Sequence, residues 1–230
     1  MALIEARDVA KTYAVRGVET LALRGVSLAI EAGEFTVLAG PSGSGKTTLL
    51  NLFGALDAPS TGSVRVDGQE LAALSRAELA SLRLAKLGFV FQAFNLIPVL
   101  TARENVEFVM ELQGVPLTER RARALAMLAE VGIAELADKR PLEMSGGQQQ
   151  RVAVARAIVS QPRLVLADEP TANLDSDTAA RLIELMERLN HQHGVTFLFS
   201  THDPLVIAKA HRVIRLRDGR IVADERQAPH

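Results

Sequence analysis

The sequence predicts an α/β fold built on a parallel sheet, preceded by an antiparallel β section and interrupted by a helical section. Three observations predict it. Short apolar runs before residue 31, broken by Gly17 and Gly25, are typical of antiparallel strands. The stretch from about 93 to 144 is helical in pattern. Runs of strand length alternate with helical segments, as parallel βαβ units require, at 34–39, 87–91, 164–167 and 195–199.

Helix-capping residues and helix-ending glycines predict the helices in the first half of the chain. The Ala-rich segment 71–85 is predicted as one helix. Thr101 and Glu104 form a capping box that starts another helix. Residues 117–131 form an amphipathic pattern, with Gly114 before it and Gly132 after it as helix stops.

The second half of the chain completes the sheet. A helix over residues 178–190 separates the last two parallel strands, as a βαβ crossover needs. The tail from 213 to 222 reads as a β-hairpin because Asp218-Gly219 is a favoured turn pair between two apolar runs. No linker or internal repeat divides the chain, so residues 1–230 are expected to form a single domain.

Composition excludes several function classes. The chain has 230 residues, is 48% hydrophobic and 23% charged, and can bury a full core. Its formal net charge of −1 gives no basic excess for nucleic acid, and the absence of cysteine excludes disulfides and thiolate metal sites. No leader sequence is expected at residues 1–5, and no apolar run approaches the length that spans a bilayer. A role at a membrane is therefore expected to be peripheral.

A phosphate-binding loop follows the first parallel strand. Its residues match the pattern G-x-x-x-x-G-K-[ST] and are Gly40, Pro41, Ser42, Gly43, Ser44, Gly45, Lys46 and Thr47. In this pattern backbone N–H groups surround the phosphates, the lysine reaches the β- and γ-phosphates, and the hydroxyl binds Mg²⁺. A helix from Thr48 onward points its N-terminal dipole at the anion. The loop predicts a nucleoside triphosphatase.

A second sequence with a phosphate-binding character lies about a hundred residues later. It consists of Ser145, Gly146, Gly147 and Gln148, and the helix that follows runs from 149 to 160. Ser145 and Gln148 alone indicate only a well-capped helix. The adjacent glycines cost helix propensity and leave backbone N–H groups open to an anion, which predicts a second phosphate-contacting surface.

An acidic pair ends the apolar run at 163–167. A carboxylate at a strand end can hold Mg²⁺ through water, and its neighbour can orient or deprotonate an attacking water. Asp168 and Glu169 precede Pro170, a composition that is also common in turns. The phosphate loop elsewhere in the chain favours the catalytic interpretation.

With these motifs the chain resembles the nucleotide-binding subunits of ATP-binding cassette (ABC) transporters. Their signature Leu-Ser-Gly-Gly-Gln corresponds to residues 144–148, with Met144 in place of leucine. The resemblance covers nearly the whole chain. It implies a P-loop NTPase fold with a RecA-like core, an N-terminal antiparallel β subdomain and a helical subdomain at about 93–150. It also implies that Asp168 binds the metal and that Glu169 acts on the water.

The same resemblance implies roles for four more residues. Gln92 matches the Q-loop glutamine, a ligand near Mg²⁺, and His202 matches the switch histidine that contacts the γ-phosphate. Asp175 matches the D-loop, and it is equally suited to cap the helix that starts near 176. Tyr13, the single tyrosine, matches the aromatic residue that stacks on adenine, although a half-buried strand tyrosine is the alternative. Lys46, Glu169 and His202 are thus the expected catalytic residues.

The resemblance implies an Mg²⁺-dependent ATPase that works as a homodimer, with the signature of one subunit completing the partner's site. It implies an integral-membrane permease as partner and a place at the cytoplasmic face of the inner membrane. Segments 89–92, 94–98 and 104–106 are most similar to lipoprotein-releasing, macrolide-exporting and cell-division ATPases. Export-type extrusion is therefore expected, and a non-transporting, division-type signalling complex is the alternative.

Three other classes fit the sequence less well. An ABC ATPase of DNA repair would carry a long coiled coil, and no sustained heptads occur. A translation-type ABC protein would join two cassettes in one chain. A P-loop kinase would share Lys46 and Thr47 but has no use for residues 145–148.

An apolar segment next to Gln92 predicts a partner surface. Three of the eight phenylalanines lie at 89–94, and residues 96–100 are all apolar. Phe89 and Phe91 are expected in the strand core, and part of 94–100 is expected to be exposed. We expect this segment to form a groove for a short helix of the permease, in which Leu96 and Ile97 take part.

Overall fold

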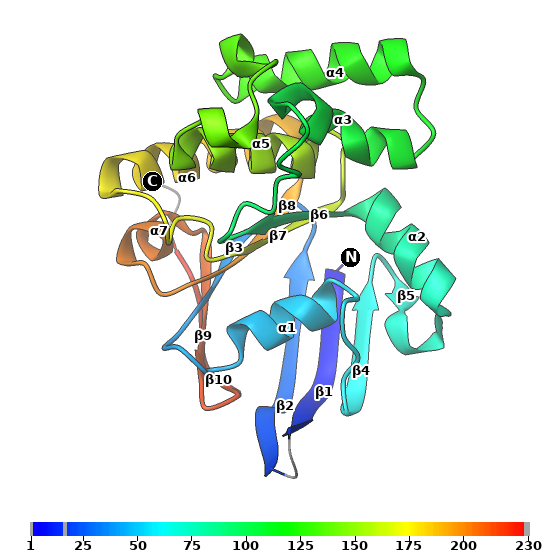
Figure 1. The fold of residues 1–230 in the computed structure, drawn as a ribbon. Coiled ribbons are helices and arrows are strands. Elements are labelled where there is room, and N and C mark those ends of the chain that lie inside the picture. The colour runs from blue at the N-terminus through cyan, green and yellow to red at the C-terminus, as the bar shows by residue number, and fades with distance from the viewer. Residues whose placement is uncertain (1, 16–17, 228–230) are drawn as a thin grey trace.

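The computed structural model describes residues 2–15 and 18–227, arranged around a six-stranded sheet (Figure 1). The strand order is β10-β9-β3-β8-β7-β6, and every neighbouring pair is parallel except β9 and β10. This confirms the predicted parallel α/β core. The strands are β3 (Phe35–Ala39), β6 (Leu87–Phe91), β7 (Leu164–Asp168), β8 (Thr196–Thr201), β9 (Arg212–Arg217) and β10 (Arg220–Arg226).

A second, antiparallel sheet of order β2-β1-β4-β5 covers one side of the core. Its register steps from Val9 opposite Val26 to Ala10 opposite Arg24, which leaves Gly25 as a bulge with a φ of 72°. The prediction that Gly25 breaks a strand was wrong, because the strand continues through this bulge. Gly17 lies outside the described residues. The strands are β1 (Ala2–Val15), β2 (Val18–Glu31), β4 (Thr61–Val66) and β5 (Gln69–Glu70).

Successive side chains of the buried strands point to opposite faces of the six-stranded sheet, and each face has its own hydrophobic core. Phe35 and Val37 of β3 point into a core shared with α3, α4, α5 and α6, whereas Leu38 points into a core shared with α1 and the antiparallel sheet. Figure 1 shows α3, α4 and α5 on one side of the six-stranded sheet and α1 on the other. The helices are α1 (Lys46–Phe53), α2 (Arg76–Lys86), α3 (Ala102–Leu112), α4 (Leu117–Glu130), α5 (Gly146–Ile158), α6 (Ser176–His193) and α7 (Pro204–Lys209).

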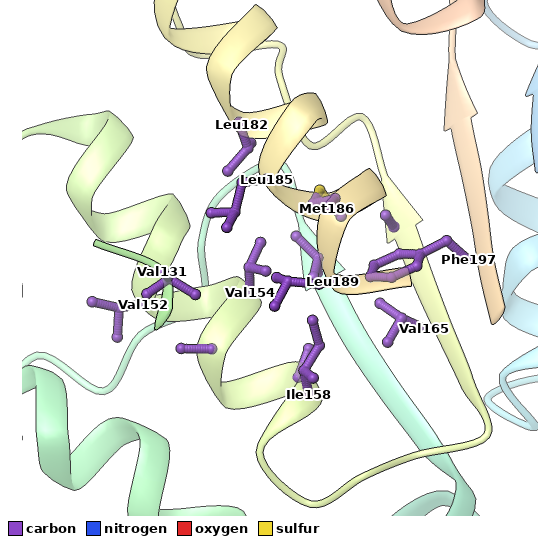
Figure 2. Close-up of a cluster of buried hydrophobic side chains, with 14 of the residues drawn as sticks. Val131, Val152, Val154, Ile158, Val165, Leu182, Leu185, Met186, Leu189 and Phe197 are labelled. Atoms are coloured by element: carbon purple, nitrogen blue, oxygen red, sulfur yellow. The ribbon is translucent and has the colours of Figure 1, made fainter. Parts of the chain in front are cut away.

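The helical core holds α5 and α6 against the sheet. Figure 2 shows Val154 and Ile158 of α5 facing Leu185 and Leu189 of α6, with Phe197 of β8 beside them. All five side chains are at least 98% buried. The start of α5, which carries the signature residues, is therefore fixed relative to the strands that end at the acidic pair.

The predicted positions of α3 and α4 are confirmed, the ends of α1, α5 and α6 differ from the prediction by two or three residues, and one predicted helix is wrong. Segment 71–85 is divided into a 3₁₀ turn (Leu71–Ala73) and α2, because Ser75 caps α2 through a capping box with Glu78 and cannot lie inside a helix. Thr101 and Glu104 cap α3 as expected. Two further 3₁₀ turns, Ala134–Leu136 and Pro141–Glu143, lead into α5.

The predicted C-terminal hairpin is confirmed. Asp218 and Gly219 join β9 to β10 with φ values of 50° and 75°, the left-handed pair that a tight hairpin turn requires. Within the described part of the chain, no helix combines the length and the apolar character needed to cross a bilayer.

Candidate active site

A cavity of about 590 Å³ opens at the carboxyl ends of β3, β7 and β8, where ligands bind in open α/β sheets. It brings together most residues that the sequence singled out. Gly40 and Ser44 belong to the same loop without lining the cavity. The predicted residues that line it are Tyr13, Pro41, Ser42, Gly43, Gly45, Lys46, Thr47, Thr48, Gln92, Asp168, Glu169 and His202.

The loop that follows β3 needs its glycines. A Cβ at Gly40 would collide with the backbone oxygen of Leu216 on β9, and one at Gly45 would lie 2.8 Å from the backbone oxygen of Ala22 on β2. Gly45 also has a φ of 104° and directly precedes α1. These close approaches place the loop's N–H groups and the start of α1 at the cavity, a geometry that suits a phosphate.

Lys46 supplies the positive charge of the loop. Its side chain is buried, and its Nζ donates to the backbone oxygens of Gly40 at 2.8 Å and Pro41 at 3.1 Å. The ammonium is therefore held over the loop, within the curve of backbone N–H groups that would surround a phosphate.

Thr47 and Asp168 place two oxygen atoms side by side at the cavity. The Thr47 hydroxyl donates to Asp168 Oδ1 at 3.2 Å, and Ser200 donates to the same oxygen at 2.6 Å. Gln92 lines the same cavity. Mg²⁺ prefers hard oxygen ligands and keeps several waters, so this donor set fits the ion.

Glu169 and His202 form a second pair at the ends of neighbouring strands. Glu169 Oε1 lies 2.9 Å from His202 Nδ1, and Glu169 Oε2 accepts from Thr201 Oγ1 at 3.1 Å. Glu169 has a φ of 46°, and its own N–H donates to Ser200. A glutamate in this left-handed conformation costs on the order of 1–3 kcal/mol, which is characteristic of functional sites.

Tyr13 lines the cavity from β1 and is held by Asp57. Its hydroxyl donates to Asp57 Oδ2 at 2.9 Å, Lys11 donates to Asp57 Oδ1 at 2.6 Å, and the Lys11 ammonium lies 4.9 Å from the Tyr13 ring centre. Burial and the bond to Asp57 raise the pKa of the Tyr13 hydroxyl. Although burial opposes ionisation of Asp57, the bonds from Lys11 and Tyr13 hold the pKa of this carboxyl below its ordinary value.

The signature residues do not reach this cavity. Ser145 caps α5 and forms a reciprocal capping box with Gln148, but none of residues 145–148 lines the cavity. Gly147 also has a packing role, because a Cβ there would lie 2.5 Å from Thr178 Cγ2 of α6. The sequence predicts only an anion-binding role for Gly146 and Gly147, and the structure adds a packing contact for Gly147.

Asp175 also lies outside the cavity and caps α6. Its carboxylate accepts from the Thr178 N–H at 2.9 Å, and this bond lowers the pKa of Asp175. The capping role predicted for Asp175 is confirmed by this contact.

Three residues that the sequence analysis missed hold the segments around the cavity through bonds to backbone oxygens. Gln150 is fully buried and donates to the backbone oxygen of Pro170 at 2.7 Å. Arg156 donates to the backbone oxygens of Phe94 and Asn95, and burial lowers the pKa of its guanidinium. Asn173 donates to the backbone oxygen of Gln92 at 2.9 Å. Their partners are backbone groups far away in the chain, so no local sequence signal could have revealed them.

A glycine-rich loop at a helix N-terminus, a hydroxyl–carboxylate pair and a glutamate at a strand end together define a P-loop nucleoside triphosphatase. Comparisons with known proteins identify a family within this class. The sequence profile of the ABC transporter family matches residues 23–172. This chain therefore belongs to the ABC transporter family, as an ATP-binding domain that hydrolyses ATP.

Individual relatives agree with this assignment. A macrolide export ATP-binding/permease protein, MacB, from Syntrophobacter fumaroxidans is 47% identical over 221 residues, which cover 95% of this chain and 31% of MacB. This chain thus spans about a third of the length of that relative. A protein from Thermotoga maritima, named as an uncharacterized ABC transporter ATP-binding protein, is 46% identical over 98% of this chain and 96% of its own length.

A solved structure confirms the fold class. The ATP-binding cassette MJ0796, in a dimeric post-hydrolysis state bound to ADP and Pi, has a TM-score of 0.90 to this chain. The two are 42% identical, and the alignment covers 99% of this chain and 100% of MJ0796. The resemblance inferred from the motifs is confirmed.

Proposed function

We propose that this chain binds MgATP as one half of a homodimer and that hydrolysis drives an export permease in the membrane. One observation supports the proposal most strongly: the predicted ATP-contacting residues lie in two separate places on the chain's surface. The cavity holds Lys46, Asp168 and Glu169, whereas residues 145–148 lie outside it. A second copy can supply those residues, and the dimeric form of MJ0796 supports this arrangement.

The site would bind ATP at its phosphates and at its adenine ring. The loop N–H groups and Lys46 would bind the phosphates, and Tyr13 would stack on the adenine. Thr47 and Asp168 would hold Mg²⁺ with Gln92 nearby. When bound, Mg²⁺ neutralises phosphate charge that develops during transfer.

Glu169 would act on the water. The water oxygen attacks the γ-phosphorus, its proton passes to the Glu169 carboxylate, and the bond from the γ-phosphorus to the bridging oxygen breaks, giving ADP and phosphate. His202 and Thr201 hold the two carboxylate oxygens, so they fix the direction in which Glu169 accepts the proton. In the dimer, the N-terminus of the partner's α5 would contact the γ-phosphate.

The permease would dock at the β6 edge of the sheet. Phe89 and Phe91 are half-buried there with rings 5.9 Å apart and nearly parallel. Phe89 packs against the core beside α1, as predicted, whereas the prediction of a core position for Phe91 was wrong. The reason is that β6 is an edge strand. The two phenylalanines, together with Asn95, Val109 and Arg156, line a hollow of about 240 Å³. Leu96 and Ile97, the residues predicted to take part in a groove, do not line this hollow.

This hollow is connected to the nucleotide. Gln92 follows β6, and the turn after it places Phe94 and Asn95 at φ values of 59° and 49°, a strained shape that Arg156 holds through both backbone oxygens. A residue such as phenylalanine rarely adopts this conformation, so the turn stores local strain. A change at Gln92 could therefore alter the surface on which the permease docks.

The relative named as a macrolide export protein favours export as the direction of transport. We propose that the chain acts as a single ATP-binding domain, held at the cytoplasmic face of the inner membrane through its permease.

The test of hydrolysis is the ATPase activity of the purified chain with and without Mg²⁺. Glu169→Gln should lower turnover by about 10²–10⁴-fold and leave ATP binding intact, because it removes only the group that takes the proton. Glu135→Gln, a change on the exposed surface, is the matched control and should have wild-type turnover. Wild-type turnover by Glu169→Gln would refute the role of this carboxylate.

A further inference from the structure

A cluster of side chains that could bind a metal lies at the end of β3 opposite to the nucleotide cavity. Glu187 and His191 of α6 and His211, just before β9, each offer one ligand atom, and these atoms all lie within 4.8 Å of one another. Among residues 2–15 and 18–227 this is the one such group of three or more histidine, cysteine or acidic side chains.

The spacing of these residues explains why they converge. Glu187 and His191 are four residues apart, so they lie one above the other on the same face of α6. His211 Nε2 is 3.3 Å from Glu187 Oε1, and the rings of His191 and His211 are 5.7 Å apart. The two elements thus present their ligand atoms to each other.

His211 is fixed in position by its backbone and ring. Its N–H donates to the Phe35 backbone oxygen at 3.0 Å, and its own oxygen accepts from the Gln227 N–H at 2.8 Å. Its ring packs on that of Phe35, with centres 5.6 Å apart. The nearby Lys209 ammonium lies 3.7 Å from a Glu184 carboxylate oxygen, which offsets its charge.

The geometry suits a tetrahedral ion. Bonds of about 2.0–2.2 Å from zinc to nitrogen or oxygen place neighbouring ligand atoms about 3.3 Å apart. The Glu187–His211 pair already has this separation. His191 is exposed, so its side chain can turn to bring its ring nitrogen closer to the other two ligand atoms, which lie within 4.8 Å of it. Two imidazoles and one carboxylate are ligands that Zn²⁺ accepts, whereas Mg²⁺ prefers oxygen ligands alone.

We propose that Glu187, His191 and His211 form a Zn²⁺ site, with water as fourth ligand, that fastens the end of α6 to the start of β9. The site lies beside Phe35, the first residue of β3, whereas the phosphate loop follows Ala39, the last residue of β3. The ion therefore has a stabilising role that is separate from ATP hydrolysis. Bound Zn²⁺ adds a link between elements that are distant in the chain.

The experiment titrates the tag-free 230-residue chain with ZnCl₂ in a calorimeter, with excess Mg²⁺ present throughout. One Zn²⁺ per chain should bind, and His191→Ala should weaken binding by at least about 100-fold, because one of three protein ligands is lost. Free Zn²⁺ at 100 times the wild-type Kd should raise the Tm of the wild-type chain by about 5 °C or more and that of the variant by about 1 °C at most.

His193→Ala is the matched control. His193 lies on the same helix and pairs with Glu130 at 2.7 Å, but it belongs to no converging group of three among the described residues. This variant should bind Zn²⁺ like the wild-type chain. Glu187→Gln provides a second variant and should also weaken binding. No Zn²⁺ binding by the wild-type chain, or equal binding by His191→Ala, would overturn the proposal.

Discussion

Nδ1 of His202 lies 2.9 Å from Oε1 of Glu169, so the residues that follow β8 and β7 meet at the cavity. His202→Ala removes the partner of one carboxylate oxygen and leaves Thr201 on the other. We expect ATP turnover to fall by about 100-fold, at the lower end of effects on proton transfer, with ATP affinity nearly unchanged. Steady-state kinetics and nucleotide titration measure the two quantities. His193→Ala, which changes a histidine–glutamate pair outside the cavity, should have wild-type turnover.

The Tyr13 side chain supports a second prediction, on nucleotide affinity. Tyr13→Phe keeps the ring and should keep ATP affinity, whereas Tyr13→Ala should lose on the order of 1 kcal/mol, or about fivefold in Kd. The phenylalanine variant also loses the bond to Asp57, so its unfolding free energy should fall by about 1 kcal/mol. Nucleotide titration and urea unfolding measure these effects. Equal affinities for all three proteins would assign Tyr13 a purely structural role.

The pH dependence of tyrosine absorbance gives a third prediction. Tyr13 is the single tyrosine and the chain has no tryptophan, so phenolate absorbance reports one group. Its titration midpoint should lie above 10, and Asp57→Asn should lower the midpoint while burial keeps part of the shift. Since the pKa is raised on folding, the stability from the neutral phenol is complete below pH 10 and is lost as pH rises through the folded value. A midpoint at 10 or below in the folded wild-type chain would contradict this.

The surface next to Gln92 gives a fourth prediction. Leu96 packs against the helical core, so Leu96→Glu should destabilise the fold. Ile97 is partly exposed and belongs to neither core, so Ile97→Glu should keep the fold and basal ATPase activity. A chimaera in which this chain replaces the ATP-binding region of MacB should confer macrolide resistance, and Ile97→Glu should abolish it. Full resistance with Ile97→Glu would remove this residue from the docking surface.

The parallel core and the phosphate loop could be predicted because they depend on local signals. Alternating apolar runs, capping residues such as Thr101 and Glu104, and the glycines of the loop are all visible within a few positions. The division at Ser75 was missed because an Ala-rich helical pattern on both sides outweighed one capping residue. The core position expected for Phe91 is wrong because hydrophobicity does not reveal which strand lies at a sheet edge.

Contacts between distant segments could not be predicted in this way. Asp57 meets Tyr13 across 44 positions, and Arg156 reaches Phe94 across 62. Neither pairing is visible in the sequence as a periodic pattern or a motif, because each depends on how two separate segments pack in the folded chain. The Glu187, His191 and His211 cluster has the same origin, since one of its members lies outside the helix that carries the other two.

The central claim, that two copies share each ATP site, is tested most directly by the mass of the Glu169→Gln variant with MgATP. Size-exclusion chromatography with light scattering should show a dimer, because ATP binds and is not hydrolysed. Adding Gly146→Asp should restore the monomer, since its carboxylate would repel the partner's phosphate while a Cβ at this position makes only an ordinary 3.6 Å contact with Phe94. A Glu169→Gln variant that binds MgATP and remains a monomer would contradict the shared site.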